Sequence, residues 1–211
     1  MKFSPLFAAT LVTAALSVGG AANAAIVVTP GNNGGGSVDN VLLGGCTGTS
    51  LVPPNTLQGC LNDDKTQLVN FTSNEALTAV ANGQARIMAM DEGFQSLTIS
   101  LAALNATFST LVLNINAATN GTVRFFGMPG DASNEFALSD NGNNWFTITG
   151  EDFRSVRFEA TGALNIVTDV RQVRLNGIKT NDVPEPASLA LLGLGLMGIG
   201  AARRLRKADK A

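Results

Sequence analysis

The sequence predicts an all-β protein, an antiparallel β-sandwich of jelly-roll type, flanked by an N-terminal signal-peptide helix and a C-terminal transmembrane helix. Short apolar and β-branched stretches recur about every 8 to 12 residues, which is the spacing typical of sandwich strands. Clusters of Gly, Asn and Asp separate these stretches, as expected of turns between antiparallel strands. Each end of the chain also carries a long apolar segment, which predicts the two flanking helices.

The N-terminus has the order of parts of a secretory signal peptide. Lys2 gives a basic start, residues 6–18 are apolar, and Ala22 and Ala24 are the small side chains that signal peptidase requires before Ala25. We therefore expect residues 1–24 to be removed by signal peptidase after the general export machinery has engaged them. A retained N-terminal anchor is the alternative interpretation.

The body of the chain, residues 25–182, has a length typical of one domain with a single hydrophobic core. The whole chain has 14 Lys and Arg against 16 Asp and Glu, and its formal net charge is −2. This balance provides no basic surface for nucleic acid. The arginines of the body are spread along it and are expected on solvated strand faces: Arg86, Arg124, Arg154, Arg157, Arg171 and Arg174.

The first part of the body is predicted to contain strands at residues 25–29 and 37–43. Between them, residues 30–36 are a run of Gly and Asn that we expect to form a flexible surface loop. A phosphate-binding loop is the alternative, but the run lacks the Gly-Lys-Ser/Thr ending that such a loop needs. Residues 44–60 are expected to form a second loop.

Cys46 and Cys60 are the two cysteines of the chain, and both lie in the exported body. In an oxidising compartment an even, closely spaced pair is expected to form a disulfide. A reactive thiol or half of a metal site is the alternative. Neither has support, because the chain has no His and no other Cys to complete the site.

The rest of the body is predicted to consist mainly of strands. One helix is expected at residues 74–81, with Ser73 or Asn74 as its N-cap, although the same residues could form a strand. The further strand candidates are residues 67–72, 84–90, 96–102, 110–115, 122–128, 135–138, 145–149, 155–160, 163–167 and 170–175.

Alternation along these strands predicts which side chains face the core. Arg157 and Glu159 should face solvent, because their neighbours on either side are apolar. The predicted core-facing residues are Leu97, Ile99, Leu101, Leu111, Leu113, Ile115, Val156, Phe158 and Ala160. In the last strand the alternation slips between Val170 and Val173, and a bulge near residues 171–172 would turn both toward the core.

The absence of His excludes the usual Ser-His-Asp and Cys-His sites and any zinc site with imidazole ligands. A carboxylate pair for glycoside hydrolysis is the enzymatic alternative that the composition leaves open. Most of the available acids lie in predicted turns, where Asp is favoured for backbone hydrogen bonding. These acids are Asp91, Glu92, Asp131, Glu135, Asp140, Glu151 and Asp152. We therefore assign no catalytic residue and no cofactor, and expect a protein that is not an enzyme.

Trp145 and Phe146 are the candidate sugar contacts. They are neighbours on one predicted strand, so they face opposite sides of the sheet, and the outward ring could stack on a sugar. Residues 140–144 carry closely spaced oxygen donors of the kind that calcium prefers. A hairpin turn explains this segment more simply, so no metal ligand is assigned.

The C-terminal segment, residues 183–211, contains a short extended motif, an apolar run at residues 187–202 and a basic cluster. At about 1.5 Å per residue the run spans roughly 24 Å as a helix, slightly less than a bilayer core, and snorkelling basic side chains can extend it. The motif consists of Val183, Pro184, Glu185 and Pro186, and the basic stop at residues 203–207 includes Arg203, Arg204, Arg206 and Lys207.

This order of parts closely resembles the PEP-CTERM sorting tail of Gram-negative bacteria. The resemblance implies a transient inner-membrane intermediate and removal of the tail by a membrane protease-transferase of the exosortase type. The rest of the chain would then reach the cell surface or the exopolysaccharide matrix. A plain single-span anchor is the alternative. Residues 71–75, 83–87, 145–148 and 169–174 are also similar to a recurrent module of small proteins that carry this tail, a module without assigned activity.

Together these features predict an exported surface or biofilm-matrix protein that is sorted by an exosortase-type system. Its body is expected to be a non-enzymatic structural or polysaccharide-associating module, with exopolysaccharide as a candidate partner. The alternatives are an extracellular glycan-active enzyme that uses a carboxylate pair, or an ice-binding protein. Ice binding would require a flat array of threonines, which Thr147 and Thr149 alone do not supply.

Overall fold

The computed structural model describes residues 25–49, 52–80 and 84–180. The predicted signal peptide, sorting motif, transmembrane helix and basic stop lie outside these ranges. Across the described residues every regular element is a β-strand. No helix among them is long and apolar enough to span a bilayer.

The strands of the described chain are β1 (Val27–Pro30), β2 (Asp39–Leu42), β3 (Thr56–Leu61), β4 (Leu68–Thr72), β5 (Leu77–Ala79), β6 (Arg86–Ala89), β7 (Ser96–Leu101), β8 (Ala106–Ala117), β9 (Gly121–Met128), β10 (Phe136–Leu138), β11 (Asn144–Phe153), β12 (Ser155–Thr161), β13 (Val167–Asn176) and β14 (Lys179–Thr180). The longest of these strands are β8, β11 and β13.

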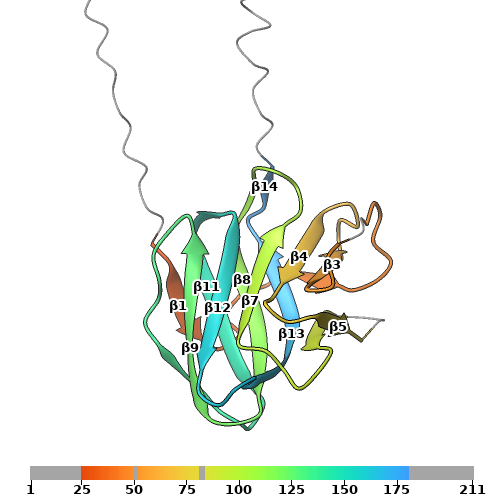
Figure 1. The fold of residues 1–211 in the computed structure, drawn as a ribbon. Helices are drawn as coiled ribbons and strands as arrows, with labels where there is room; N and C mark the ends of the chain where they lie inside the picture. Colours follow the sequence, from red (N-terminus) through yellow and green to blue (C-terminus); the bar gives the residue numbers. More distant parts are fainter. Residues whose placement is uncertain (1–24, 50–51, 81–83, 181–211) are drawn as a thin grey trace, which may run out of the picture.

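All strand pairs are antiparallel, and they form one nearly closed, barrel-like sheet. Layer A contains β1, β11, β8, β13, β6 and β5, and layer B contains β3, β4, β7, β12, β9 and β10. Figure 1 shows β9, β12 and β7 of layer B in front of β11 and β8 of layer A. The predicted all-β antiparallel class is confirmed.

The two layers are not separate sheets, because β2 belongs to both. Its first half, Asp39 and Asn40, pairs with β13, and its second half, Val41 and Leu42, pairs with β3. On the opposite side the sheet stays open between β1 and β10, the two ends of the strand order. The sheet therefore has one continuous corner and one open edge.

The core lies between the layers and is rich in Phe. The ring of Phe125 in layer B lies 5.0 Å from that of Phe146 in layer A, centroid to centroid. All the core-facing residues predicted from alternation are buried: Leu97, Ile99, Leu101, Leu111, Leu113, Ile115, Val156, Phe158 and Ala160. Period-2 alternation therefore identified the inner face of these strands correctly.

The predicted bulge in the last strand is confirmed. The register between β13 and β8 shifts between Arg171 and Arg174, and Gln172 has a φ of 55°. As a result Val170 and Val173 are both fully buried. The extra residue keeps an apolar face on both halves of a strand whose sequence breaks the simple alternation.

The disulfide between Cys46 and Cys60 is also confirmed. Cys60 is buried on β3, and the bridge ties the segment before that strand to layer B. The prediction that residues 44–60 form only a loop was wrong, because β3 begins at Thr56 and pairs with β4 along its length.

The helix predicted at residues 74–81 was wrong, and the strand alternative is correct. Leu77–Ala79 form β5, which pairs with β6. Leu77 is buried opposite Ala89, so the segment adds an edge to layer A. Burial against a neighbouring strand thus overrides a weak helical signal.

Two further strand boundaries differ from prediction. Of residues 163–167 only Val167 is in a strand, and Asn165 has a φ of 54°, which is typical of a turn. The turn expected at residues 149–151 lies inside β11, whose register shifts between Thr149 and Phe153. The irregularity lets the strand continue to the buried Phe153.

Residues 30–36, predicted to be a flexible surface loop, pack on the outer face of layer A. The backbone N–H of Asn33 donates to Thr147 Oγ1 at 2.9 Å, and that hydroxyl donates to the Gly31 carbonyl at 2.9 Å. A Cβ on Gly34 would lie 2.6 Å from a methyl of Val112, so only glycine allows this close approach. The loop therefore covers part of the face next to the site described below.

Candidate functional site

Four polar or aromatic side chains form a row across the outer face of layer A. The register places Arg86 of β6 opposite Arg171 of β13, Arg171 opposite Asn114 of β8, and Asn114 opposite Trp145 of β11. Directly paired residues of antiparallel strands project to the same face, so these four side chains are neighbours. At roughly 5 Å per pair the row is about 15 Å long.

A polar hollow of about 420 Å³ opens over this row. Its lining contains the two guanidinium groups and several amides, and no carboxylate. The lining residues are Gln84, Ala85, Arg86, Asn114, Asn143, Arg171 and Gln172. Such a lining offers many hydrogen-bond donors together with several carbonyl acceptors.

Asn114 lies on the floor of this polar hollow and is only 2% exposed. Its Nδ2 donates to Asn143 Oδ1 at 3.4 Å. Its Oδ1 is buried and has no hydrogen-bond partner among the described residues. A buried acceptor without a partner costs free energy, roughly 1 to 3 kcal/mol, unless a bound group donates to it.

A second, apolar hollow of about 390 Å³ lies at the open edge of the sheet, where β1 and β11 meet β10. Asn143 lines both hollows, so they share a rim. The apolar hollow is lined by Pro30, Gly31, Phe136, Ala137, Asn143, Asn144, Trp145 and Phe146. A polar and an apolar surface are thereby joined on one side of the molecule.

Trp145 and Phe146 face opposite sides of β11, as the sequence predicted. Phe146 is buried and packs against Phe125 and Phe136 in the core. Trp145 is half-buried on the outer face, and the guanidinium of Arg174 lies 5.6 Å from the centre of its ring. Of the two candidate sugar contacts, Trp145 is thus the one on the outer face.

Asp169 holds the two arginines of the row in place. It is buried on β13, and its Oδ1 accepts from Arg171 Nε at 2.7 Å. Its Oδ2 accepts from Arg171 and Arg86 guanidinium nitrogens at 3.1 Å each, and from Asn116 Nδ2 at 3.1 Å. Both carboxylate oxygens thus accept from donors, and both guanidinium groups are oriented beside the polar hollow.

The pKa of Asp169 is lowered from its ordinary value. Burial raises this pKa, but hydrogen bonds from Arg171 and Asn116, together with the charges of Arg171 and Arg86, outweigh the effect of burial. The carboxylate is therefore ionised at neutral pH. The sequence reasoning did not place Asp169 among the candidate acids. The signal available was an acid between two predicted strands, two residues before an arginine.

The face around the polar hollow is positively charged. Arg86, Arg171 and Arg174 contribute three positive charges, and Asp169 contributes one negative charge, which leaves a balance of +2. Arg174 is held by Asn40 and Asn32, whose side-chain oxygens accept from it, rather than by an acid. This local sign is opposite to the net charge of −2 of the whole chain.

The acids predicted as candidates for catalysis lie elsewhere. All seven are exposed, and none lines either hollow: Asp91, Glu92, Asp131, Glu135, Asp140, Glu151 and Asp152. Glu135 is paired with Arg124 at 3.6 Å, and Asp152 with Lys179 at 2.8 Å. A hydrogen bond from Lys179 lowers the pKa of Asp152; desolvation opposes this effect, and the charge of Lys179 and a hydrogen bond from Thr107 add to the lowering.

The turn at residues 140–144, considered for calcium, uses its amide groups to close the hairpin. Asn144 Oδ1 accepts from the backbone N–H of Ser139 at 2.8 Å, and Asn144 Nδ2 donates to the carbonyls of Ser139 and Ile115. In the described ranges no three His, Cys, Asp or Glu residues are grouped so that they could hold a metal ion.

Thr147 and Thr149, the threonines considered for ice binding, do not form a flat array. Thr147 is buried beneath the loop at residues 30–36, and its hydroxyl is used by Gly31 and Asn33. Thr149 is exposed beside β1, opposite Val27. The two threonine side chains therefore lie in different environments, one buried and one exposed.

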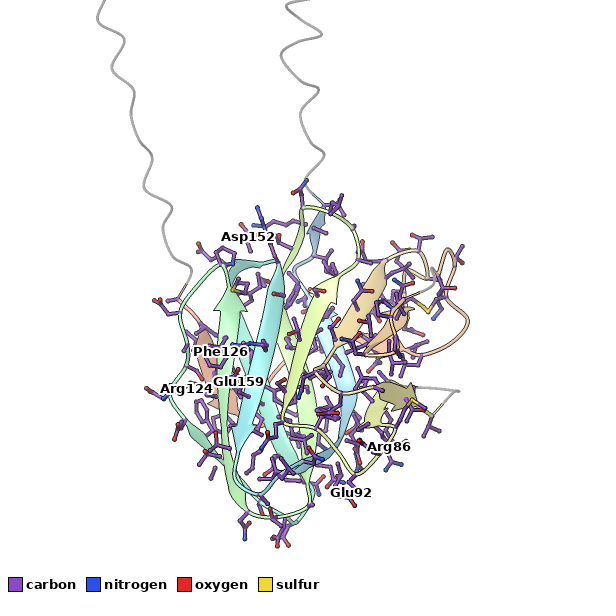
Figure 2. All side chains as sticks on the ribbon, in the orientation of Figure 1. Arg86, Glu92, Arg124, Phe126, Asp152 and Glu159 are labelled. Atoms are coloured by element: carbon purple, nitrogen blue, oxygen red, sulfur yellow. A yellow bond between two sulfur atoms is a disulfide. The ribbon has the colours of Figure 1, made fainter. Side chains whose placement is uncertain are left out.

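Both ends of the described chain lie at the same end of the barrel, away from the row. β1 begins, and β14 ends, at the upper end in Figure 1. β14 pairs with the start of β8, and Lys179 bonds to Asp152 there. In Figure 2 Asp152 lies at this end and Arg86 toward the opposite end. The last described strand, β14, thus ends on the side remote from Arg86.

A search of curated proteins gave no match to this chain. A comparison with family models gave a match over residues 182–207, immediately after the last described strand. The matched residues include the motif at 183–186, the apolar run and the basic cluster that the sequence analysis singled out. The chain therefore carries at its C-terminus a PEP-CTERM protein-sorting motif, the signal that directs an exported protein toward processing by an exosortase and toward the cell surface.

Proposed function

We propose that this protein is a polysaccharide-associating component of the cell surface or extracellular matrix of a Gram-negative bacterium. In this proposal the two ends of the chain direct export and sorting, and the β-sheet body supplies binding rather than catalysis. The sorting motif at residues 182–207 supports the route. The outer face of layer A supports the binding role.

The observation that carries the binding role is the junction of the polar and apolar hollows at Asn143. A sugar ring has an apolar face of C–H groups and an edge of hydroxyl groups. Trp145 and Pro30 offer apolar surface, while Asn114 and Gln84 offer amide groups for hydroxyls. The arrangement therefore matches both surfaces of a sugar.

The position of this face also supports the proposal. Arg86, which lines the polar hollow, lies toward the end of the barrel remote from Asp152 (Figure 2), and β14, after which the sorting motif follows in the sequence, lies beside Asp152. A body attached or held through its C-terminal end would leave the hollow accessible. Binding at this face is therefore compatible with every stage of sorting.

A binding role is favoured over a hydrolytic one by the distribution of acids. A retaining or inverting glycosidase requires two carboxyl groups that face each other across a cleft. Among the described residues, neither hollow has a carboxylate in its lining. The carboxylate of Asp169, beside the polar hollow, is ion-paired with both Arg86 and Arg171. The residues that line the two hollows supply hydrogen-bond donors and the aromatic ring of Trp145, and these are groups that a binding module uses.

Affinity electrophoresis tests this proposal. The processed protein, purified after export, is run through gels that contain the extracellular polysaccharide extracted from the producing cells. We expect the wild-type protein to be retarded, Trp145→Ala to be retarded much less, and Trp145→Phe to keep most of the effect because it retains an aromatic ring. Equal migration of wild type in gels with and without the polysaccharide would reject the binding role.

A further inference from the structure

We infer that the polar hollow selects sugars that carry an anionic group, so that the preferred ligand is an acidic polysaccharide. The inference rests on the proposed function, because it concerns the same face of layer A. It concerns which class of polysaccharide is bound, and the observations that carry it are the two arginines, the partnerless oxygen of Asn114 and the length of the row.

The arginines provide the anion contact. Arg86 and Arg171 share the single carboxylate of Asp169, so the pair keeps a net positive charge beside the polar hollow. Their side chains are 47% and 36% exposed, which leaves guanidinium edges free to face a ligand. A planar guanidinium group binds carboxylate or sulfate oxygens through parallel N–H bonds.

Asn114 provides the contact that distinguishes a sugar from a simple anion. Its buried Oδ1 can only accept, so its partner must donate an O–H or N–H. A free carboxylate or sulfate ion at neutral pH has no such donor. A sugar with one anionic group and neighbouring hydroxyls supplies both the anion for the arginines and the donor for Asn114.

The geometry of the row fits a chain of sugars rather than a single ring. Arg86 and Trp145 lie three strand spacings apart, about 15 Å, on one continuous face. The apolar hollow beside Trp145 extends this face beyond the row to the open edge of the sheet. A polymer could therefore place an anionic unit at Arg86 and Arg171 and another ring near Trp145.

Asp169 acts as a positioning residue in this arrangement. Its bonds to Arg171 and Arg86 fix the guanidinium groups before a ligand binds, which lowers the conformational entropy lost on binding. It also reduces the positive charge of the two arginines, so that the three groups together carry a charge of +1.

The test compares gels containing polygalacturonate, dextran sulfate or neutral dextran, with the processed wild-type protein. We expect retardation by polygalacturonate, dextran sulfate or both, and little or none by dextran, with the effect decreasing as salt is raised. Comparing polygalacturonate with dextran sulfate shows whether the preferred anionic group is a carboxylate or a sulfate. Retardation by dextran as strong as that by both charged polymers would overturn the inference and leave the proposed function standing.

Arg86→Gln and Arg124→Gln form a matched pair of variants. Both remove one positive charge from a side chain that is 47% exposed and ion-paired, but Arg124 lies on β9 in layer B. We expect Arg86→Gln to weaken binding to the charged polymer roughly tenfold, and Arg124→Gln to leave it nearly unchanged. Equal losses in the two variants would show a non-specific charge effect and overturn the inference.

Two more measurements separate loss of binding from loss of folding. The urea midpoint of each variant shows whether the body is intact, and Arg86→Lys, which keeps the charge, should recover part of the affinity. Asn114→Leu should weaken binding even though it changes no charge, because it removes the acceptor for the sugar hydroxyl. Full affinity in a folded Asn114→Leu variant would contradict the role assigned to that oxygen.

Discussion

Asp169 and Arg171 lie on the same strand, two residues apart, and are joined by two hydrogen bonds. Arg171 Nε donates to Oδ1 at 2.7 Å and a terminal nitrogen donates to Oδ2 at 3.1 Å, so the contact is bidentate. Because Asp169 also accepts from Arg86 and Asn116, it connects β13 to the strands on both sides of it. This carboxylate organises the outer face of layer A.

The first prediction is that Asp169→Asn destabilises the body by about 1 to 3 kcal/mol, because hydrogen bonds to a charged group are lost and two arginines lose their counter-charge. Urea unfolding of the processed protein measures the difference. Glu135→Gln is the control, since it removes an exposed carboxylate paired with Arg124 and should change the free energy of unfolding by less than about 1 kcal/mol. Equal effects of the two substitutions would contradict the role of Asp169.

The second prediction concerns pH. Because the folded-state pKa of Asp169 lies below the ordinary value of 3.8, its ionised form stabilises the fold. This contribution is fully present above pH 3.8 and is lost as the pH falls from there through the lowered folded pKa. The stability difference between wild type and Asp169→Asn should therefore be constant near neutral pH and shrink in this acidic range. A stability difference that grows on acidification would mean that the pKa of Asp169 is raised by folding, and it would contradict this prediction.

The third prediction concerns the disulfide. Cys46 and Cys60 are 14 residues apart, and closing a loop of this size stabilises by about 3 kcal/mol in the chain-entropy model. We expect a reductant to lower the free energy of unfolding of the wild type by about this amount. The double variant Cys46→Ala with Cys60→Ala should start at the lower value and be unaffected by reductant. A reductant effect on the double variant would mean that another process is being measured.

The fourth prediction concerns the irregular part of β11. A Cβ on Gly150 would overlap the ring of Phe153, which is fully buried, so Gly150→Ala should destabilise by about 1 to 3 kcal/mol through overpacking. Gly36→Ala is the control, because nothing lies within 4 Å of its added Cβ. Thermal or urea unfolding compares them. Similar stability of the two alanine variants would show that the ring can move aside.

The fifth prediction concerns sorting. Replacing Pro184, Glu185 and Pro186 by alanine should leave the protein in the inner membrane with its tail attached, because the exosortase no longer recognises the motif matched at residues 182–207. Cell fractionation and mass spectrometry of the C-terminus measure the outcome. Alanine at Ser188, which follows the Val183–Pro186 segment within the matched range, is the control and should be processed normally. Normal release of the triple variant would refute exosortase processing.

Much of the fold could be predicted from short stretches of the sequence. Alternation identified the core faces of the strands at residues 96–102 and 155–160, and the slip between Val170 and Val173 located the bulge at Gln172. These features depend only on the period-2 geometry of a strand, which each short segment carries in itself. The spacing of the two cysteines likewise predicted their pairing.

The sequence did not show contacts that depend on neighbours in space. Residues 77–79 form a strand because β6 offers an edge for pairing, and the surface loop at residues 30–36 contacts Thr147 and Val112. Local propensity is weak in both segments, so long-range contacts determine the outcome. No pattern within either segment shows those contacts.

By itself, the sequence determined the all-β class, the inner faces of most strands, the disulfide and the sorting tail, because each depends on residues that are close to one another along the chain. Only the tertiary structure decided the site. Arg86, Asn116 and Asp169 come together from separations of 83 and 53 residues, and Trp145 joins their face through the register of β8 with β11 and β13. Register is set by the packing of whole strands, so the positions of these side chains depend on the complete fold.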